Sequence, residues 1–216
     1  MSYDAVLFDF DGVLVEPPSS ETLQNTLERV YDSFELQRPT PEEVSAFVKG
    51  NLEAISSRCQ QLGVDTDRFC AQAAREAIRV QREELEAGMR STYDDIAALC
   101  SLEASLGVVS DNHPTALSLV LQRVGVVSRF ETIHGCPFTP TGFERRKPNP
   151  HNLETALVAL DVDPERALYV GDRDVDIEAA DNAGVDSAHL TRDGSSIDRS
   201  PTHRLSSLRD LSAIVS

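Results

Sequence analysis

Two aspartates stand directly after an apolar stretch near the N-terminus. Residues 4 to 13 read DAVLFDFDGV, in which one phenylalanine separates Asp9 from Asp11 and Gly12 comes next. Carboxylates this close together repel each other, and each resists burial unless it is paired or ligates a cation. The stretch therefore predicts that a cation or a basic side chain lies among these carboxylates.

Three further polar signals accompany predicted strands farther along the chain. Ser110 follows the residues GVV, and Asp172 follows YVG with Asp176 close behind. Lys147 lies in RRKPNP, a loop that precedes a predicted helix. Ligands of an open parallel sheet gather outside the carboxyl ends of its strands. Each signal alone is common in turns, but their shared place at strand ends and their order along the chain predict one site.

The rest of the pattern alternates short apolar runs with amphipathic helices. Strands are predicted over residues 3–9, 105–110, 130–135, 166–172 and 185–190, and helices over 93–103, 114–124, 150–160 and 174–184. A polar loop over 191–202 and a last short helix are expected to end the chain. Such alternation predicts an α/β fold: a doubly wound, Rossmann-like parallel sheet covered by helices on both faces.

One block departs from this alternation. Between Ser20 and about Ala87 the sequence contains capped amphipathic helices and no convincing strand. Because the block follows the first strand, it interrupts the sheet in sequence. The pattern therefore predicts an α/β core domain of residues 1–16 and 88–216, with an inserted all-helical domain of residues 17–87.

The acidic composition limits the partners of this chain. The 216 residues carry a formal net charge of −16, and Lys49 and Lys147 are the only lysines beside 18 arginines. We therefore expect neither nucleic acid nor an anionic membrane as a partner. An excess of carboxylates with few lysines also resembles proteins of salt-loaded cytoplasms, such as those of halophilic archaea.

Several features predict a cytoplasmic location. No apolar run approaches the roughly 20 residues needed to span a bilayer, and the predicted first strand leaves no room for a signal peptide. The cysteines form no CxxC pair and have no histidines at metal-ligand spacing, so we expect free thiols and no zinc site. They are Cys59, Cys70, Cys100 and Cys136.

The residues at the strand ends resemble the four short motifs of the haloacid dehalogenase superfamily of phosphatases. DFDGV at 9–13 matches the first motif and Ser110 in GVVSDN the second. Lys147 in RRKPNP matches the third, and VGDRDVDIEAADNAG at 170–184 matches the long and specific fourth. The framework spans nearly the whole chain, and the helical block between the first two motifs resembles the C1 cap of subclass I.

The resemblance implies a role for each motif residue. Asp9 would attack phosphorus and form an aspartyl-phosphate, while Asp11 would act as general acid and base toward the leaving alcohol and the hydrolytic water. Ser110 would hydrogen-bond a phosphoryl oxygen, and Lys147 would pair with the phosphoryl group and with the Asp9 charge. Gly12 would allow the turn that lets backbone N–H groups face the phosphate.

The resemblance also implies a Mg²⁺ ion, which takes hard oxygen ligands. These would be the Asp9 carboxylate, the Asp11 backbone carbonyl and Asp172, with Asp176 supporting the site directly or through water. The cation and Lys147 would make the acidic cluster tolerable and would attract a phosphoryl dianion.

Some residues depart from the family pattern. Asp111 stands where relatives more often carry Asn or a small polar residue. Because a carboxylate beside the phosphate would repel it, we expect Asp111 to point away, the alternative being that it tunes specificity. Arg173 stands where serine is common, and we expect it to face solvent. His113 and His151 are expected to be loop or helix-start residues without a catalytic role.

The leading hypothesis for function is a Mg²⁺-dependent phosphatase of small phosphomonoesters that resembles phosphoglycolate phosphatase. A phosphomutase of the β-phosphoglucomutase type and a catalytically silent binding module stay open as alternatives. A dehalogenase is disfavoured because those relatives do not keep an acid at the position of Asp11. Specificity is expected from the loops around 16–20 and 48–53, which do not name a substrate. The oligomeric state has no signal in the sequence.

The net charge predicts a response to salt. Self-repulsion weakens a compact acidic chain, and the screening length falls from about 10 Å at 0.1 M salt to about 3 Å at 1 M. Melting temperature and turnover should therefore both rise from about 0.05 M to about 1 M KCl at fixed Mg²⁺, because closure of an acidic cap over an acidic core meets less repulsion. A KCl titration of one preparation measures both quantities. A flat or falling melting temperature would show that the excess carboxylates are ordinary solvated surface residues without adaptation to salt.

Overall fold

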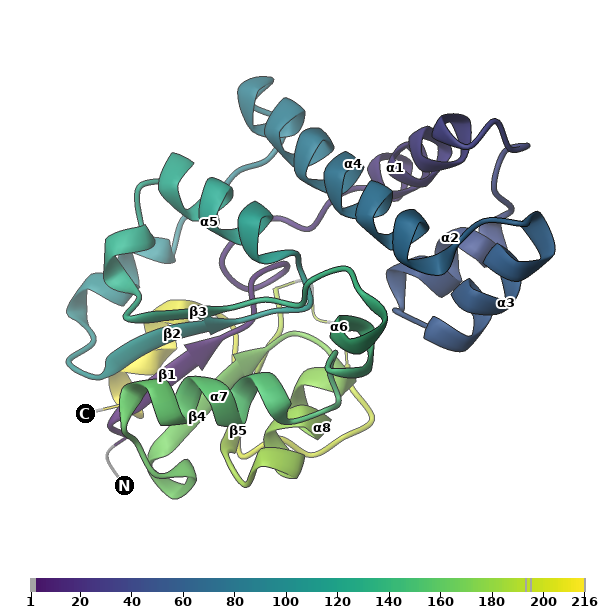
Figure 1. The fold of residues 1–216 in the computed structure, drawn as a ribbon. Coiled ribbons are helices and arrows are strands. Elements are labelled where there is room, and N and C mark those ends of the chain that lie inside the picture. Colours follow the sequence, from purple (N-terminus) through teal and green to yellow (C-terminus); the bar gives the residue numbers. More distant parts are fainter. Residues whose placement is uncertain (1–2, 193, 195, 216) are drawn as a thin grey trace.

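The computed structural model describes residues 3–192, 194 and 196–215, and its centre is a parallel β-sheet. Six strands lie side by side in the order β3-β2-β1-β4-β5-β6, and every pair is parallel (Figure 1). Their bounds are β1 Ala5–Phe8, β2 Ser105–Val109, β3 Thr132–His134, β4 Ala167–Gly171, β5 Asp186–Leu190 and β6 His203–Leu205. The predicted α/β fold class is confirmed.

The first strand is buried on both faces, which explains its unbroken apolar sequence. Val6 and Phe8 point into one hydrophobic cluster, while Ala5 and Leu7 point into the other. All four side chains are fully buried. Alternate residues of a strand face opposite sides of the sheet, so one short apolar run fills both layers.

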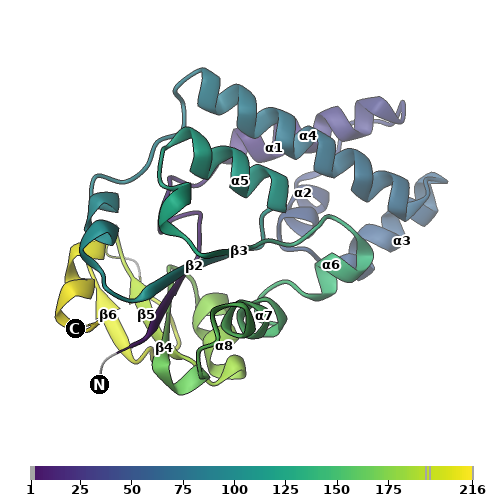
Figure 2. The same cartoon turned by 60° about the vertical axis from the view of Figure 1, so that its left-hand side comes forward.

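Helices cover both faces of the sheet (Figure 2). One face is covered by α5 (Pro114–Arg123) and by a 3-10 helix at Leu208–Ala213, which both contribute to the same hydrophobic cluster. On the other face lie α7 (His151–Leu160) and α8 (Asp174–Ala183). This is the doubly wound arrangement that the alternating pattern predicts.

The strand order fixes where a ligand can bind. The chain runs outward from β1 through β2 to β3, then returns to place β4 on the other side of β1. In such sheets the crevice outside the carboxyl ends opens at the point where the order reverses. Here that point lies between β1, which leads into Asp9, and β4, which leads into Asp172.

A separate layer of four helices follows β1, beyond the carboxyl ends of the strands (Figure 1). The helices are α1 Ser20–Ser33, α2 Pro41–Val48, α3 Leu52–Leu62 and α4 Thr66–Glu86. Side chains of Ser19, Thr40, Asn51 and Asp65 cap their N-termini. The layer packs around a second hydrophobic cluster that includes Tyr31 and Phe69 and is completed by Phe138 and Phe143 from the segment around α6 (Pro140–Glu144). The exact division into domains stays a prediction.

Three local predictions differ from the structure. The helix expected over 93–103 is a shorter 3-10 helix at Ile96–Ser101. A short helix α6 (Pro140–Glu144), capped by Thr139, lies where only a loop is expected. The strand β6 was missed because its three residues, His-Arg-Leu, carry too short a pattern to distinguish it from a loop.

Residues 193 and 195 of the predicted polar loop lie outside the described residues. No helix in the described part of the chain is both long and apolar enough to cross a membrane.

A partly buried ion pair ties the C-terminal part of the chain to the loop after β1. Asp95 accepts hydrogen bonds from Arg192 at 3.0 and 3.1 Å, from the Ser207 hydroxyl at 2.8 Å and from the Leu208 N–H at 2.8 Å. Arg192 in turn donates to the carbonyl oxygen of Val13 at 2.7 Å. Burial opposes the charge of Asp95, but these donors hold its pKa below the usual value.

Removing this anchor should destabilise the core. We expect Asp95→Ala to lower the free energy of unfolding by about 3 kcal/mol, because it leaves a cation and two donors without their acceptor. Urea denaturation at neutral pH measures the loss. Since the native pKa is depressed, the contribution exists above the unfolded pKa and is lost as pH falls through the native one, so the difference between the two proteins should shrink below about pH 4.

A matched control is available at the exposed pair Asp4–Arg166, whose side chains are 47% and 52% exposed. Asp4→Ala should cost less than about 1 kcal/mol. Equal losses in the two variants would contradict the anchoring role of Asp95.

Candidate active site

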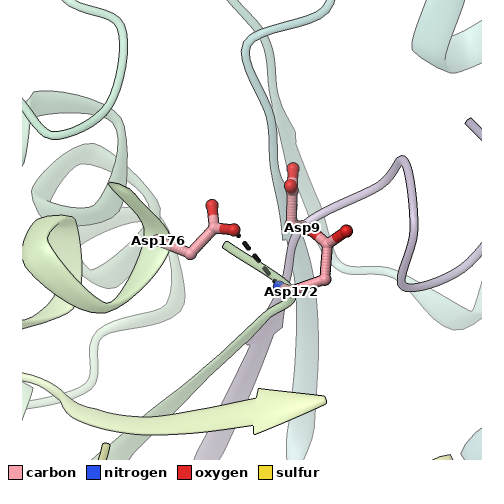
Figure 3. Close-up of side chains that lie close together, drawn as sticks. All are labelled: Asp9, Asp172 and Asp176. Carbon is pink, nitrogen blue, oxygen red and sulfur yellow. Dashed lines mark hydrogen bonds between the residues drawn. The ribbon is translucent and has the colours of Figure 1, made fainter. Parts of the chain in front are cut away.

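Three carboxylates converge where the strand order reverses (Figure 3). Asp9 follows β1, Asp172 follows β4, and Asp176 lies in the first turn of α8. One oxygen atom from each lies within 4.8 Å of the others. Asp9 is 2% exposed and Asp176 is completely buried. The structure thus brings together the three side chains that the sequence places at two separate strand ends.

Lys147 lies between two of these carboxylates. Its ammonium nitrogen Nζ is 2.8 Å from Asp9 Oδ1 and 2.5 Å from Asp176 Oδ1. Its third contact is Tyr169 Oη at 3.0 Å, and that hydroxyl donates to the Val109 carbonyl at 2.9 Å. A lysine ammonium has three donors, and here each finds an acceptor. One compact charge therefore bridges two buried acids.

The N-terminus of α8 stabilises the second acid. Asp176 Oδ2 accepts hydrogen bonds from the backbone N–H groups of Arg173 at 2.9 Å and Asp172 at 3.2 Å. Gly171 permits this approach, because a Cβ atom there would come within 2.2 Å of Asp176. Both oxygens of Asp176 are therefore engaged within the protein.

The cluster perturbs the pKa of each acid in a way that follows from its partners. Burial raises the pKa of Asp9 to about 7, with Lys147 opposing the shift and Asp176 adding to it. Burial and the charge of Asp176 raise the pKa of Asp172 to about 6. Burial also opposes the charge of Asp176, but Lys147 and Arg173 hold its pKa below the usual value. One lysine is thus insufficient to keep all three acids strongly ionised.

The unpartnered atoms of the cluster fit a cation. Among the described residues, Asp9 Oδ2 and Asp172 Oδ1 are buried and have no hydrogen-bond partner. Buried carboxylate oxygens normally have a donor or a metal ion. The Arg173 guanidinium lies 3.7 and 3.8 Å from these two oxygens, too far for a hydrogen bond, so a hard divalent cation could still bind them directly. The donor set is therefore suited to Mg²⁺, with Asp9 and Asp172 offering the free atoms.

Asp11 is held from two sides at the edge of this cluster. Arg90 donates to Asp11 Oδ1, and Asn112 Nδ2 donates to Oδ2 at 2.6 Å. Burial raises the pKa of Asp11, and the guanidinium and the amide oppose that shift. The side chain of Asp11 remains 27% exposed, so it can reach a ligand.

Gly12 serves the geometry of the loop. Its φ of +81° is left-handed, and a Cβ atom would lie 2.1 Å from Asp172 Oδ2. Its own N–H donates to the Val15 carbonyl at 2.8 Å. This amide is therefore engaged within the loop, and Gly12 permits the turn and the close approach of Asp172; the expectation that backbone N–H groups of the turn face phosphate stays a prediction.

A cavity of about 250 Å³ opens beside the acids, between the sheet and the helical layer. Ser110 contributes to its floor and is 3% exposed. The helical layer provides a largely apolar wall with three polar side chains: Pro17, Pro18, Thr22, Leu23, Thr26, Phe47, Val48, Ala77, Val80 and Gln81. Both loops expected to set specificity reach the cavity, but α1 and α4 contribute more of the wall.

A larger cavity, of about 310 Å³, lies within the helical layer between α1, α2 and α3. It contains none of the strand-end acids and is lined mainly by apolar residues of that layer's own core. Of these two cavities, the smaller one is therefore the candidate active site.

The two departures from the motif pattern have clear positions. Asp111 Oδ1 accepts the backbone N–H of Lys147 at 3.0 Å, so this carboxylate anchors the lysine loop although it also lines the cavity. Arg173 does not simply face solvent: its guanidinium lies 3.7 Å from Asp9 Oδ2 and 3.8 Å from Asp172 Oδ1. Half of its side chain is exposed, but the three acids attract its charged end. His113 and His151 begin α5 and α7 as expected.

The sequence patterns do not predict several residues that contribute to the site. Asn112 lies two residues after Ser110, and its place in GVVSDN was an available signal. Tyr169 has the apolar pattern of a strand residue, and nothing in that pattern reveals its hydroxyl contacts. Arg146 reaches from the core to the helical layer, where it donates to the Val48 carbonyl at 3.2 Å. Arg90 carries no sequence signal, because its partners lie far away in the chain.

Comparison with known proteins identifies the family of this chain. The family profile described as haloacid dehalogenase-like hydrolase matches residues 6–190. A pyrophosphatase PpaX of Anoxybacillus flavithermus is 27% identical over 194 residues, which cover 87% of this chain and 83% of that protein. A phosphoglycolate phosphatase of Aquifex aeolicus is 29% identical over 187 residues, covering 85% and 82%.

Solved structures share the fold at lower identity. CbbY of Rhodobacter sphaeroides, solved in complex with phosphate, has a TM-score of 0.69 at 18% identity and covers 97% of this chain and 96% of its own. YfnB of Bacillus subtilis, solved with bound magnesium, has a TM-score of 0.66 at 16% identity, with both chains covered completely. The resemblance drawn from the four motifs is confirmed, and the chain belongs to the haloacid dehalogenase-like hydrolases.

Proposed function

We propose that this protein is a Mg²⁺-dependent phosphatase that hydrolyses a small phosphomonoester through an aspartyl-phosphate on Asp9. The observation that carries the proposal is the arrangement of Asp9. One of its oxygens pairs with Lys147, while the other is buried without a hydrogen-bond partner among the described residues. A carboxylate placed this way at the base of a cavity is suited to attack an electrophile.

Ser110 would hydrogen-bond the phosphoryl group, and the positive charge of Lys147 would attract it. Lys147 is held by two acids, Tyr169 and the Asp111 contact to its backbone, so its charge is fixed in advance. Ser110 presents a hydroxyl at the end of β2, and Arg173 adds a second cation at the cavity edge. Preorganised donors of this kind stabilise the charge that develops in phosphoryl transfer.

Asp11 would serve as the general acid and base. It lies two residues from the nucleophile, lines the same cavity and is bound by Arg90 and Asn112. Protonation of the leaving alcohol comes first, and deprotonation of the water that hydrolyses the aspartyl-phosphate follows. Hydrolysis releases inorganic phosphate and regenerates the Asp9 carboxylate for the next turnover.

Mg²⁺ would be held by Asp9, Asp172 and the backbone carbonyl of Asp11, with Asp176 in support. Bound there, the ion would compensate the negative charge of the three acids that Lys147 alone does not neutralise. It would also attract a phosphoryl dianion to the site. The full hydrogen bonding of Asp176 favours a supporting role.

The cavity suits a small substrate. Its volume of about 250 Å³ leaves room for a phosphoryl group and a short organic portion. The names of the two relatives, a phosphoglycolate phosphatase and a pyrophosphatase, favour a compact anionic substrate. A screen of small phosphate esters and pyrophosphate with Mg²⁺, read by release of inorganic phosphate, tests the proposal. Isomerised sugar phosphate as the dominant product would support the phosphomutase instead.

The nucleophile is tested by Asp9→Asn. The amide keeps the shape but lacks the attacking charge, so turnover should fall by several orders of magnitude while the melting temperature stays near that of the wild type. Asp4→Asn, just before the other end of the same strand, is the matched control and should retain full activity. Retention of about a tenth or more of wild-type turnover by Asp9→Asn would contradict covalent catalysis.

Removal of the metal gives a second test. EDTA should abolish turnover and Mg²⁺ should restore it, whereas Ca²⁺ should inhibit because its larger and looser coordination misplaces Asp9. Asp172→Asn should raise the Mg²⁺ concentration for half-activation by more than about tenfold. Asp174→Asn is the control, since this carboxylate contacts the Arg199 N–H at 3.0 Å instead of the cluster. Full activity in chelator would contradict the metal assignment.

A further inference from the structure

Four side chains form a closed ring of hydrogen bonds between the core and the helical layer. Arg90 donates through Nη2 to Asp11 Oδ1 and through Nη1 to Gln81 Oε1, the latter at 2.8 Å. Asn112 Nδ2 donates to Asp11 Oδ2 at 2.6 Å, and Gln81 Nε2 donates to Asn112 Oδ1 at 3.5 Å. Gln81 belongs to α4, while Asp11 and Asn112 follow β1 and β2. The ring therefore joins both layers at the general acid.

Arg90 is the member of the ring with the most contacts. Its side chain is 2% exposed, and its Nε donates to the Glu16 carbonyl at 3.0 Å. Its guanidinium also lies 5.3 Å from the centre of the Phe10 ring. Each nitrogen therefore donates to a different acceptor. Nε donates to the Glu16 carbonyl on the segment that leads from the core to the helical layer, Nη1 donates to Gln81 on α4, and Nη2 donates to Asp11. A planar guanidinium can satisfy three such directions at once, and an ammonium cannot do so in the same geometry.

The surroundings make this arrangement rigid. Glu16 and Arg90 lie on the two segments that connect the layers, and these segments pair through the Glu16 N–H and the Ser91 carbonyl at 3.0 Å. Gln81 is 8% exposed and lines the cavity. A shift of α4 relative to the sheet would therefore move Arg90, and with it the carboxylate of Asp11.

We propose that Arg90 is a positioning residue that orients the Asp11 carboxylate for proton transfer, and that Gln81 links this orientation to the placement of α4. The inference rests on the proposed function, in which Asp11 protonates the leaving group. It adds two residues from outside the four motifs. The competing account is that Arg90 only joins segments of the fold. In that case its loss would lower kcat/KM by the same factor for every substrate.

Leaving groups distinguish these accounts. Phenyl phosphate and p-nitrophenyl phosphate share a ring, but p-nitrophenolate departs readily without a proton, whereas the phenolate gains more from an acid. Since kcat/KM reports the steps up to departure of the leaving group, we expect Arg90→Gln to lower it for phenyl phosphate at least about tenfold more than for p-nitrophenyl phosphate. Equal losses on both esters would overturn the positioning role.

Two milder variants keep the test decisive if Arg90→Gln folds poorly. Arg90→Lys should recover part of the kcat/KM that Arg90→Gln loses on phenyl phosphate, because it returns a charge to Asp11 without the three-way geometry. Gln81→Leu leaves the arginine in place and removes its α4 partner, so it should shift the ratio of the two kcat/KM values in the same direction by a smaller factor. An unchanged ratio in both well-folded variants would contradict the proposal.

Two controls separate this inference from the proposed function. Arg166→Gln breaks an arginine–aspartate pair far from the cavity and should leave both kcat/KM values unchanged. Asp11→Asn should shift the ratio more than any ring variant. If Asp11→Asn leaves the ratio unchanged, the acid assignment itself fails. If it shifts the ratio and Arg90→Gln does not, only the role of Arg90 is lost.

Discussion

The contact of the Lys147 ammonium with Asp9 and Asp176 is the constraint on which the site depends. Both acids are buried, and removing a charge from water is costly unless a partner of opposite sign compensates. Lys147 offers that partner to two acids at once and gives its third hydrogen bond to Tyr169. Truncating it would leave two carboxylates without their cation, so the lysine is a requirement of the fold here as well as of the proposed chemistry.

The surrounding structure can be understood as the means of fixing this contact. The strand order sets β1 beside β4, which brings Asp9 next to the loop that carries Asp172. The N-terminus of α8 binds the far oxygen of Asp176, so its other oxygen is directed at the lysine. Asp111 holds the lysine backbone. One oxygen each on Asp9 and Asp172 keeps no hydrogen-bond donor and has only the more distant Arg173 guanidinium nearby, which favours a divalent cation there.

Sequence reasoning worked best where the backbone pattern and the chemistry coincide. The acids Asp9 and Asp172 were predictable, because each ends an apolar strand and parallel strands meet at one edge of the sheet. Arg90 and Gln81 were not, since Gln81 lies on a polar helix and Arg90 in the irregular segment after it, and each meets its partners only after the two layers pack. Arg173 was misjudged for a related reason: half of its length is exposed, while its charged end is drawn to three acids. The short strand β6 is defined by its neighbour β5 more than by its own three residues.

The central claim is that Asp9 becomes covalently phosphorylated, and the most direct measurement is to trap that intermediate. The enzyme would be mixed with p-nitrophenyl phosphate and Mg²⁺, quenched in acid within one turnover and digested for peptide mass spectrometry. The account predicts the mass of one phosphoryl group on the peptide that contains Asp9, absent from the same peptide of Asp9→Asn. A burst of p-nitrophenol with no phosphoryl group on that peptide, or with the group on another residue, would contradict it.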